Sequence, residues 1–183
     1  MKIRMSFIAM LVAVAAMSGV SDAQNATDAD EENLKNILDM MRSEINSAKI
    51  ETLNGIMQLT GDEADVFWPI YQEYEKELAK IGDERVAQIR EFLQMNESGT
   101  KDDKQWDSLI KRMIGNLQRR VDLWSEYQKK VSNALSPLRA AQFLQVEHQM
   151  AILIDLNIAL EMPTIGPPAV AGAATAQTPV KAK

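Results

Sequence analysis

The chain has 183 residues, a formal net charge of −6 and no cysteine, with 46% hydrophobic and 25% charged residues. This composition is ordinary for a globular protein with one core. An acidic surface repels nucleic acid and anionic lipid, and a chain without cysteine has neither disulfides nor thiolate chemistry. We therefore expect no nucleic-acid partner, and stability must come from packing alone.

The first 23 residues have the features of an export signal. Lys2 and Arg4 give a positive start, residues 7–20 form an uncharged apolar run, and Ser21-Asp22-Ala23 places small residues where signal peptidase cleaves. The run is shorter than the roughly 20 residues of a membrane-spanning helix. We predict cleavage after Ala23, a periplasmic location and no stable membrane insertion afterwards. Losing two basic side chains and one acidic one leaves 18 basic and 25 acidic, a net charge of about −7.

Apolar residues at three- and four-residue spacing predict four helices between residues 30 and 162, after a flexible segment at 24–29. The first helix covers about 30–57. The second begins at Thr60, which opens a capping-box pattern, and ends near Asn96. The third covers about 102–135. The fourth starts at Ser136 as N-cap, with Pro137 at its first position, and runs to about 162.

Residues 163–183 are rich in Pro, Ala and Thr and are expected to form a disordered tail. The predicted fold class is therefore all-α, with a signal peptide followed by a single helical domain at 30–162.

The short connection near residue 98 predicts that the second and third helices form a long antiparallel hairpin, flanked by the first and fourth. Folding the chain there brings positions whose numbers sum to about 197 to the same height. This register places Glu77 opposite Arg120 and Glu84 opposite Arg112. It also gathers an aromatic cluster at the root of the hairpin, consisting of Trp68, Tyr71, Trp124 and Tyr127, with Phe143 and Leu144 from the fourth helix.

The outer end of the hairpin holds more apolar side chains than two helices can bury. The flanking helices are shorter and are expected to cover the root and the middle of the hairpin. We therefore predict a client-binding surface at the tip, formed by Ile89, Phe92, Leu93, Trp106, Leu109 and Ile110. A second subunit that covers this tip is the alternative. The nearly continuous apolar run at 150–160 predicts either deep burial or a subunit contact.

Two segments of the chain share one pattern. Leu59-Thr60-Gly61-Asp62-Glu63 and Leu135-Ser136-Pro137-Leu138-Arg139 each have a leucine, a hydroxyl cap and a helix start, with a phenylalanine eight residues after the leucine. The pair resembles the repeated L-T-x-x-Q motif of the Spy/CpxP family of periplasmic chaperones. The likeness covers roughly residues 49–163. Within it, the runs at 59–74 and 135–163 look like a poorly characterised exported branch related to that family.

The chain also departs from this family. Glu63 and Arg139 stand where the motif has glutamine, and the acidic balance differs from the basic surface expected of Spy-like chaperones. The resemblance implies helical hairpins that form a curved, often dimeric chaperone, which holds unfolded proteins without ATP.

No residues in the sequence have the spacing of a catalytic or cofactor site. His148 is the one histidine, and a single histidine without cysteine falls short of the three or four ligands of a transition-metal site. Paired acids such as Asp62-Glu63 and Asp83-Glu84 are explained by a helix cap and a solvated face. We therefore expect no enzyme activity, no cofactor and no metal.

These observations predict a chaperone-like or envelope-stress protein whose partners are unfolded or envelope proteins. The alternative is a structural or adapter protein that binds one dedicated partner, such as a membrane sensor. A homodimer is compatible with either function.

Overall fold

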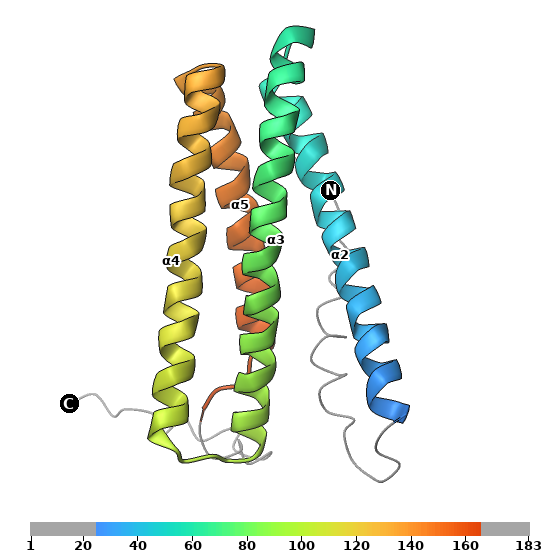
Figure 1. Cartoon of the computed structure of the whole chain (residues 1–183), viewed down its shortest axis with the longest axis vertical. Helices are drawn as coiled ribbons and strands as arrows, with labels where there is room; N and C mark the ends of the chain where they lie inside the picture. Colours follow the sequence, from blue (N-terminus) through green and yellow to red (C-terminus); the bar gives the residue numbers. More distant parts are fainter. Residues whose placement is uncertain (1–24, 166–183) are drawn as a thin grey trace, which may run out of the picture.

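The computed structural model describes residues 25–165, and these residues form four long helices with no strand among them. The helices are α2 (Asn25–Met57), α3 (Gly61–Glu97), α4 (Asp103–Ala134) and α5 (Pro137–Glu161). Figure 1 shows them running roughly side by side, with α3 and α4 joined by a tight turn at one end and α2 leaning away towards its N-terminal end. The all-α prediction is confirmed.

The helix ends differ little from those predicted, except at the start of α2. This helix begins at Asn25, so the flexible segment expected at 24–29 is helical from its second residue on. No glycine or proline interrupts the chain between Asn25 and Gly55, and the acidic residues near the start favour a helix N-terminus. The predicted signal peptide at 1–23 and most of the predicted tail lie outside the described residues.

Local caps define where the later helices begin. The Thr60 hydroxyl accepts from the Glu63 backbone N–H, and the Glu63 carboxylate accepts from the Thr60 backbone N–H at 3.0 Å, which completes the predicted capping box. The side chains of Asp102 and Ser136 cap α4 and α5 in the same way, each accepting from backbone N–H groups of the first turn.

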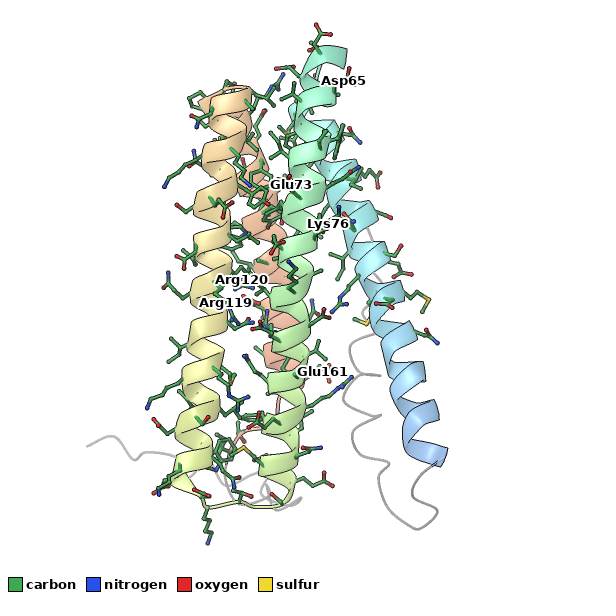
Figure 2. The ribbon with its side chains drawn as sticks, viewed as in Figure 1. Asp65, Glu73, Lys76, Arg119, Arg120 and Glu161 are labelled. Carbon is green, nitrogen blue, oxygen red and sulfur yellow. The ribbon has the colours of Figure 1, made fainter. Side chains whose placement is uncertain are left out.

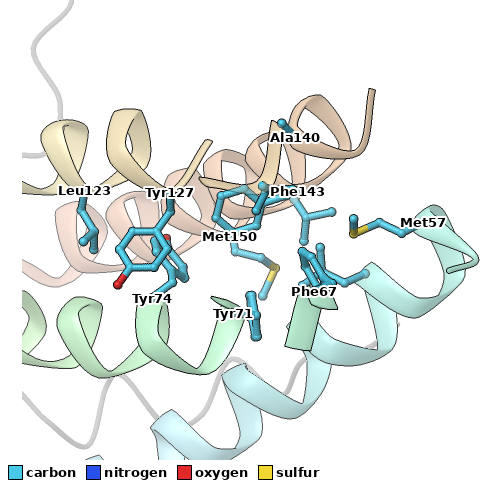
Figure 3. Close-up of a cluster of buried hydrophobic side chains, with 12 residues drawn as sticks. Met57, Phe67, Tyr71, Tyr74, Leu123, Tyr127, Ala140, Phe143 and Met150 are labelled. Atoms are coloured by element: carbon cyan, nitrogen blue, oxygen red, sulfur yellow. The ribbon is translucent and has the colours of Figure 1, made fainter. Parts of the chain in front are cut away.

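The core lies where α3, α4, α5 and the C-terminal half of α2 meet (Figure 3). Phe143 stands at its centre, with its ring edge-to-face against Phe67, Tyr71 and Tyr74 at centroid distances of 6.3, 6.3 and 5.1 Å. The buried side chains of this core are Leu53, Met57, Phe67, Tyr71, Tyr74, Leu123, Tyr127, Val131, Ala140, Phe143, Val146 and Met150. The predicted aromatic cluster at the hairpin root is thereby confirmed.

The predicted charge pairs between α3 and α4 are wrong. Arg112 pairs with Glu91 at 2.6 Å, and Glu84 pairs with Arg119. The predicted register compares only the positions of residues along the two helix axes. A side chain, however, meets the neighbouring helix only from the side that faces it. Glu84 therefore meets Arg119, which lies seven residues, about two helical turns, beyond the predicted Arg112.

Candidate partner-binding surface

The predicted client-binding residues lie near the turn between α3 and α4, where most of them are covered. Two are buried, three are half-buried and one is exposed: Ile89 and Leu109, then Phe92, Leu93 and Trp106, then Ile110. The rings of Phe92 and Trp106 meet edge-to-face at 5.8 Å, and the Trp106 indole N–H donates to the Thr100 carbonyl oxygen at 2.9 Å. The apolar side chains at the tip of the hairpin therefore largely cover one another, and only Ile110 among the six is exposed.

A stripe of exposed apolar side chains continues from Ile110 along α4. Ile110, Ile114, Leu117 and Val121 follow one another at spacings of four, three and four residues, and 46 to 61% of each is exposed. This is the spacing of a coiled-coil seam, which places all four side chains on one side of the helix. Because Leu109 and the residues in phase with it already face the core, this stripe, the α4 seam, is a second apolar side of α4.

The second half of α5 exposes a further set of apolar side chains. Ile152, Leu153, Leu156 and Leu160 are 44 to 70% exposed, whereas Met150 is buried. Deep burial, one of the two outcomes predicted for this run, is therefore wrong beyond Met150. In an exposed helix such side chains are usually covered by a partner.

A groove between α4 and α5 adjoins the α4 seam at Val121. The Trp124 and His148 rings meet edge-to-face across it at a centroid distance of 5.7 Å. Two shallow hollows of about 470 and 450 Å³ lie along the groove, both lined by Trp124, Ala141 and Leu144, with His148 in one and Val121 in the other. The α4 seam, this groove and the exposed apolar residues of α5 are together called the α4–α5 face.

Asp155 of α5 pairs its charge with arginines of the neighbouring helices, and its side chain is 35% exposed. Its carboxylate accepts from Arg85 of α3 at 2.5 Å and from Arg120 of α4 at 2.8 and 3.1 Å. Figure 2 labels Arg120 on α4. Arg120 also packs on the Trp124 ring, so the predicted pair of Arg120 with Glu77 is wrong. Burial raises the pKa of Asp155, but the two guanidinium groups outweigh this and hold that pKa below its ordinary value.

Arg139 makes a second inward contact, and its partner is Glu63 of α3. Two guanidinium nitrogens donate to the two Glu63 oxygens at 2.8 and 3.0 Å, and a third bond reaches the Met57 carbonyl oxygen at the end of α2. Hydrogen bonds from Arg139 and from the Thr60 N–H lower the pKa of Glu63 to about 2. The two positions at which the chain departs from the family motif therefore pair with each other.

The third inward charge of α5 is Glu147, which is 3% exposed. Lys49 of α2, also 3% exposed, lies 2.9 Å from it and pairs with Glu75 of α3 as well. The Tyr74 and Tyr71 hydroxyls donate to the two Glu147 oxygens at 2.7 and 3.3 Å. Burial raises the pKa of Glu147, and the attraction of Lys49 offsets this only in part.

These three contacts leave the outward side of α5 without charged side chains. Between Arg139 and Glu161 the helix has no other Lys, Arg, Asp or Glu than Glu147 and Asp155. On α5, the α4–α5 face is therefore formed by uncharged side chains, many of them apolar.

The surface predicted at the hairpin tip included only Ile110 of the α4 seam, because three- and four-residue spacing alone does not show which apolar side of α4 is covered. Leu109, Met113 and Leu123 point towards the core, whereas Ile114 and Leu117 lie further round the helix and are exposed. The signal that could have separated the two sets is the width of the apolar arc, which exceeds what one neighbouring helix covers.

Two further properties of residues 25–165 bear on function. No helix within this range is both long and apolar enough to cross a membrane. The same residues bring together no group of three or more His, Cys, Asp or Glu side chains that could hold a metal ion.

Compared with known proteins, the chain matches no family model, no curated protein and no solved structure. The resemblance to the Spy/CpxP family therefore stays a prediction based on the paired motifs.

Proposed function

We propose that this protein is a periplasmic, ATP-independent chaperone-like or envelope-stress protein whose α4–α5 face holds unfolded clients. The supporting observation is a wide apolar surface on α4 and α5 of an otherwise acidic chain. Unfolded proteins expose apolar segments, and a surface of this kind lowers their free energy by removing them from water. The predicted export signal supports the periplasmic location.

Client binding on this face needs neither a cofactor nor a nucleotide. Apolar contact is non-directional, so many sequences can occupy the same surface with modest affinity. The acidic side chains elsewhere on the chain keep the protein soluble while the apolar face is free. Binding is thus expected to be reversible and broad, which suits a protein that prevents aggregation rather than one that recognises a single sequence.

The double variant Ile114→Lys with Leu117→Glu tests this proposal. It puts two charges of opposite sign in the middle of the α4 seam and leaves the net charge unchanged. We expect it to lose most of the wild-type protection against client aggregation at near-stoichiometric ratio, measured by light scattering. Because both side chains are exposed, folding stability should change by less than about 1 kcal/mol.

The matched control places Gln72→Lys with Ala79→Glu on the exposed side of α3, where the same two charges are added. This control should protect clients as the wild type does. Full protection by the seam variant, or no protection by the wild type across several unrelated clients, would refute the proposal.

An adapter that binds one dedicated partner is the second candidate. The exposed apolar residues in the second half of α5 favour it, because a single charge-free helix face is also what a permanent partner helix covers. Pull-down from envelope extract with the wild type and the seam variant separates the two functions. One dominant partner that the seam variant loses favours the adapter, and many weakly bound proteins favour the chaperone.

We also propose that a homodimer, if it forms, pairs along the α4 seam of this face. An antiparallel pairing matches Ile110 with Val121 and Ile114 with Leu117, because the spacing of four, three and four reads the same in both directions. A parallel pairing would instead match each seam residue with its own copy.

Because the chain has no cysteine, single-cysteine variants can test this pairing. A mixture of Ile110→Cys and Val121→Cys should form a disulfide-linked dimer on mild oxidation. Ile110→Cys alone should not, because in the antiparallel arrangement its two copies lie far beyond disulfide distance. If light scattering shows a monomer at all concentrations, the proposed dimer is wrong.

A further inference from the structure

α2 is attached to the rest of the bundle through its C-terminal half. Among its described side chains, the buried ones are Lys49, Leu53 and Met57. Leu53 and Met57, the latter labelled in Figure 3, cover the aromatic core, whereas Lys49 is the single buried charge among the described side chains of α2. Whatever changes the free energy of the Lys49 contacts therefore changes how firmly α2 is held.

The charges around Lys49 do not balance. One ammonium group lies between the two carboxylates of Glu75 and Glu147, in surroundings formed largely by the Tyr71 and Tyr74 rings. The tyrosine hydroxyls donate to Glu147 but carry no positive charge. With all three groups ionised, the cluster has a net charge of −1. The side chains of Lys49 and Glu147 are 4 and 2% exposed and that of Glu75 is 22% exposed, so the excess charge is costly mainly at Glu147.

Among the described side chains of residues 25–165, no Lys, Arg or His other than Lys49 lies within ion-pair distance of Glu75 or Glu147. From α4 the cluster receives the Trp124 indole N–H, which bonds the Tyr74 hydroxyl at 3.0 Å and does not titrate. On α5, His148 is exposed and turned to the Trp124 ring. The nearest arginines on α4 and α5 are engaged elsewhere, Arg120 with Asp155 and Arg139 with Glu63.

We propose that proton binding to Glu147 controls the docking of α2, so that the helix is held more firmly at weakly acidic pH than at neutral pH. Protonation neutralises the surplus carboxylate and leaves Lys49 paired with Glu75. When α2 opens, water reaches Glu147, and its ionised form is no longer penalised.

The sign follows from proton linkage. In the docked state, burial raises the pKa of Glu147 above its ordinary value. At a pH between the ordinary and the raised pKa, docking of α2 therefore adds a proton to Glu147. The stabilisation of the docked state is complete below the ordinary carboxyl pKa and is lost as pH rises through the raised one. One linked proton changes the opening equilibrium by at most about tenfold per pH unit.

Opening of α2 would uncover the apolar surface that Leu53 and Met57 now cover. Phe67 and Phe143, both almost fully buried, belong to that surface. This inference goes beyond the proposed function and does not require it, because the proton switch is a property of the fold whether or not the α4–α5 face binds clients.

Hydrogen exchange of the full mature chain, read by mass spectrometry on peptides from residues 45–57, measures the opening directly. Samples at about pH 5.5 and about pH 7.5 are compared after correction for the pH dependence of the intrinsic exchange rate. If opening is linked to one proton, protection changes by up to tenfold per pH unit. We expect protection of these amides to be several-fold higher at the acidic pH. Equal protection at both values, or higher protection at pH near 7.5, overturns the proposal.

Three variants test whether Glu147 causes the pH dependence of protection. Glu147→Gln keeps an acceptor for the Tyr74 hydroxyl and should show the same high protection at both pH values. Glu75→Gln restores one carboxylate per ammonium and should reduce the pH dependence. His148→Gln removes the one histidine and should leave the dependence unchanged. A Glu147→Gln protein that keeps the wild-type dependence overturns the assignment, and if that variant does not fold, the wild-type profile alone decides.

Discussion

Replacing Lys49 with methionine is expected to destabilise the folded chain by roughly 3–5 kcal/mol, the cost of leaving a buried charge without its partner. Methionine fills similar space, so the loss is electrostatic rather than a cavity. Glu75 and Glu147 would then face each other without a cation, and Glu147 is 3% exposed. Urea unfolding followed by far-UV circular dichroism at neutral pH measures the change in the free energy of unfolding.

Two further variants show whether the loss of stability comes from the charge cluster. Lys76→Met on the exposed side of α3 removes the same charge and should change stability by less than about 0.5 kcal/mol. Adding Glu147→Gln to Lys49→Met should recover a large part of the loss, because a single carboxylate then stays in the cluster. If Lys49→Met is as mild as Lys76→Met, water screens the cluster in solution, and both this prediction and the proton switch would be wrong.

The second large effect is expected from Phe143→Ala, at about 3–5 kcal/mol. Phe143 is 1% exposed and its ring contacts Phe67, Tyr71 and Tyr74, so its removal leaves a cavity between α3 and α5. The surrounding rings are held by other helices and by hydrogen bonds, which limits how far they can collapse into the space. Urea unfolding gives the loss of stability, and near-UV circular dichroism reports the packing of the aromatic rings.

Leu138→Ala is the control for this variant, since Leu138 lies on the same helix and is 67% exposed. Its removal should cost less than about 0.5 kcal/mol. Equal losses from Phe143→Ala and Leu138→Ala would show that the aromatic core does not hold the bundle together.

The stability of the bundle and its candidate surface have one origin in α5. Each charged residue in the body of this helix is used inward: Arg139 with Glu63, Glu147 with Lys49, and Asp155 with two arginines. These contacts join α5 to the other three helices. They also remove charge from its outward side, so the same helix that ties the bundle together presents an apolar surface to partners.

Much of the fold could be predicted from the sequence because it depends on neighbouring residues. The helix starts at Thr60 and Ser136 follow from side chains that bond backbone groups two or three residues away. The aromatic cluster around Phe143 follows from helical periodicity and one short turn. The tightly coupled positions Glu63 and Arg139 were visible as departures from a motif, but their pairing required knowledge of how α3 and α5 pack.

The candidate surface, in contrast, was decided by tertiary structure. α4 has two apolar sides, one through Leu109 and one through Ile114, and nothing local distinguishes them. The first is buried because α3 and α5 pack against it, and the second is exposed because no described helix covers it. Helix caps and periodicity act over one or two turns, so the sequence by itself determined the helices. Which side of each helix meets water depends on contacts between residues far apart in the chain, and only the packed bundle determines that.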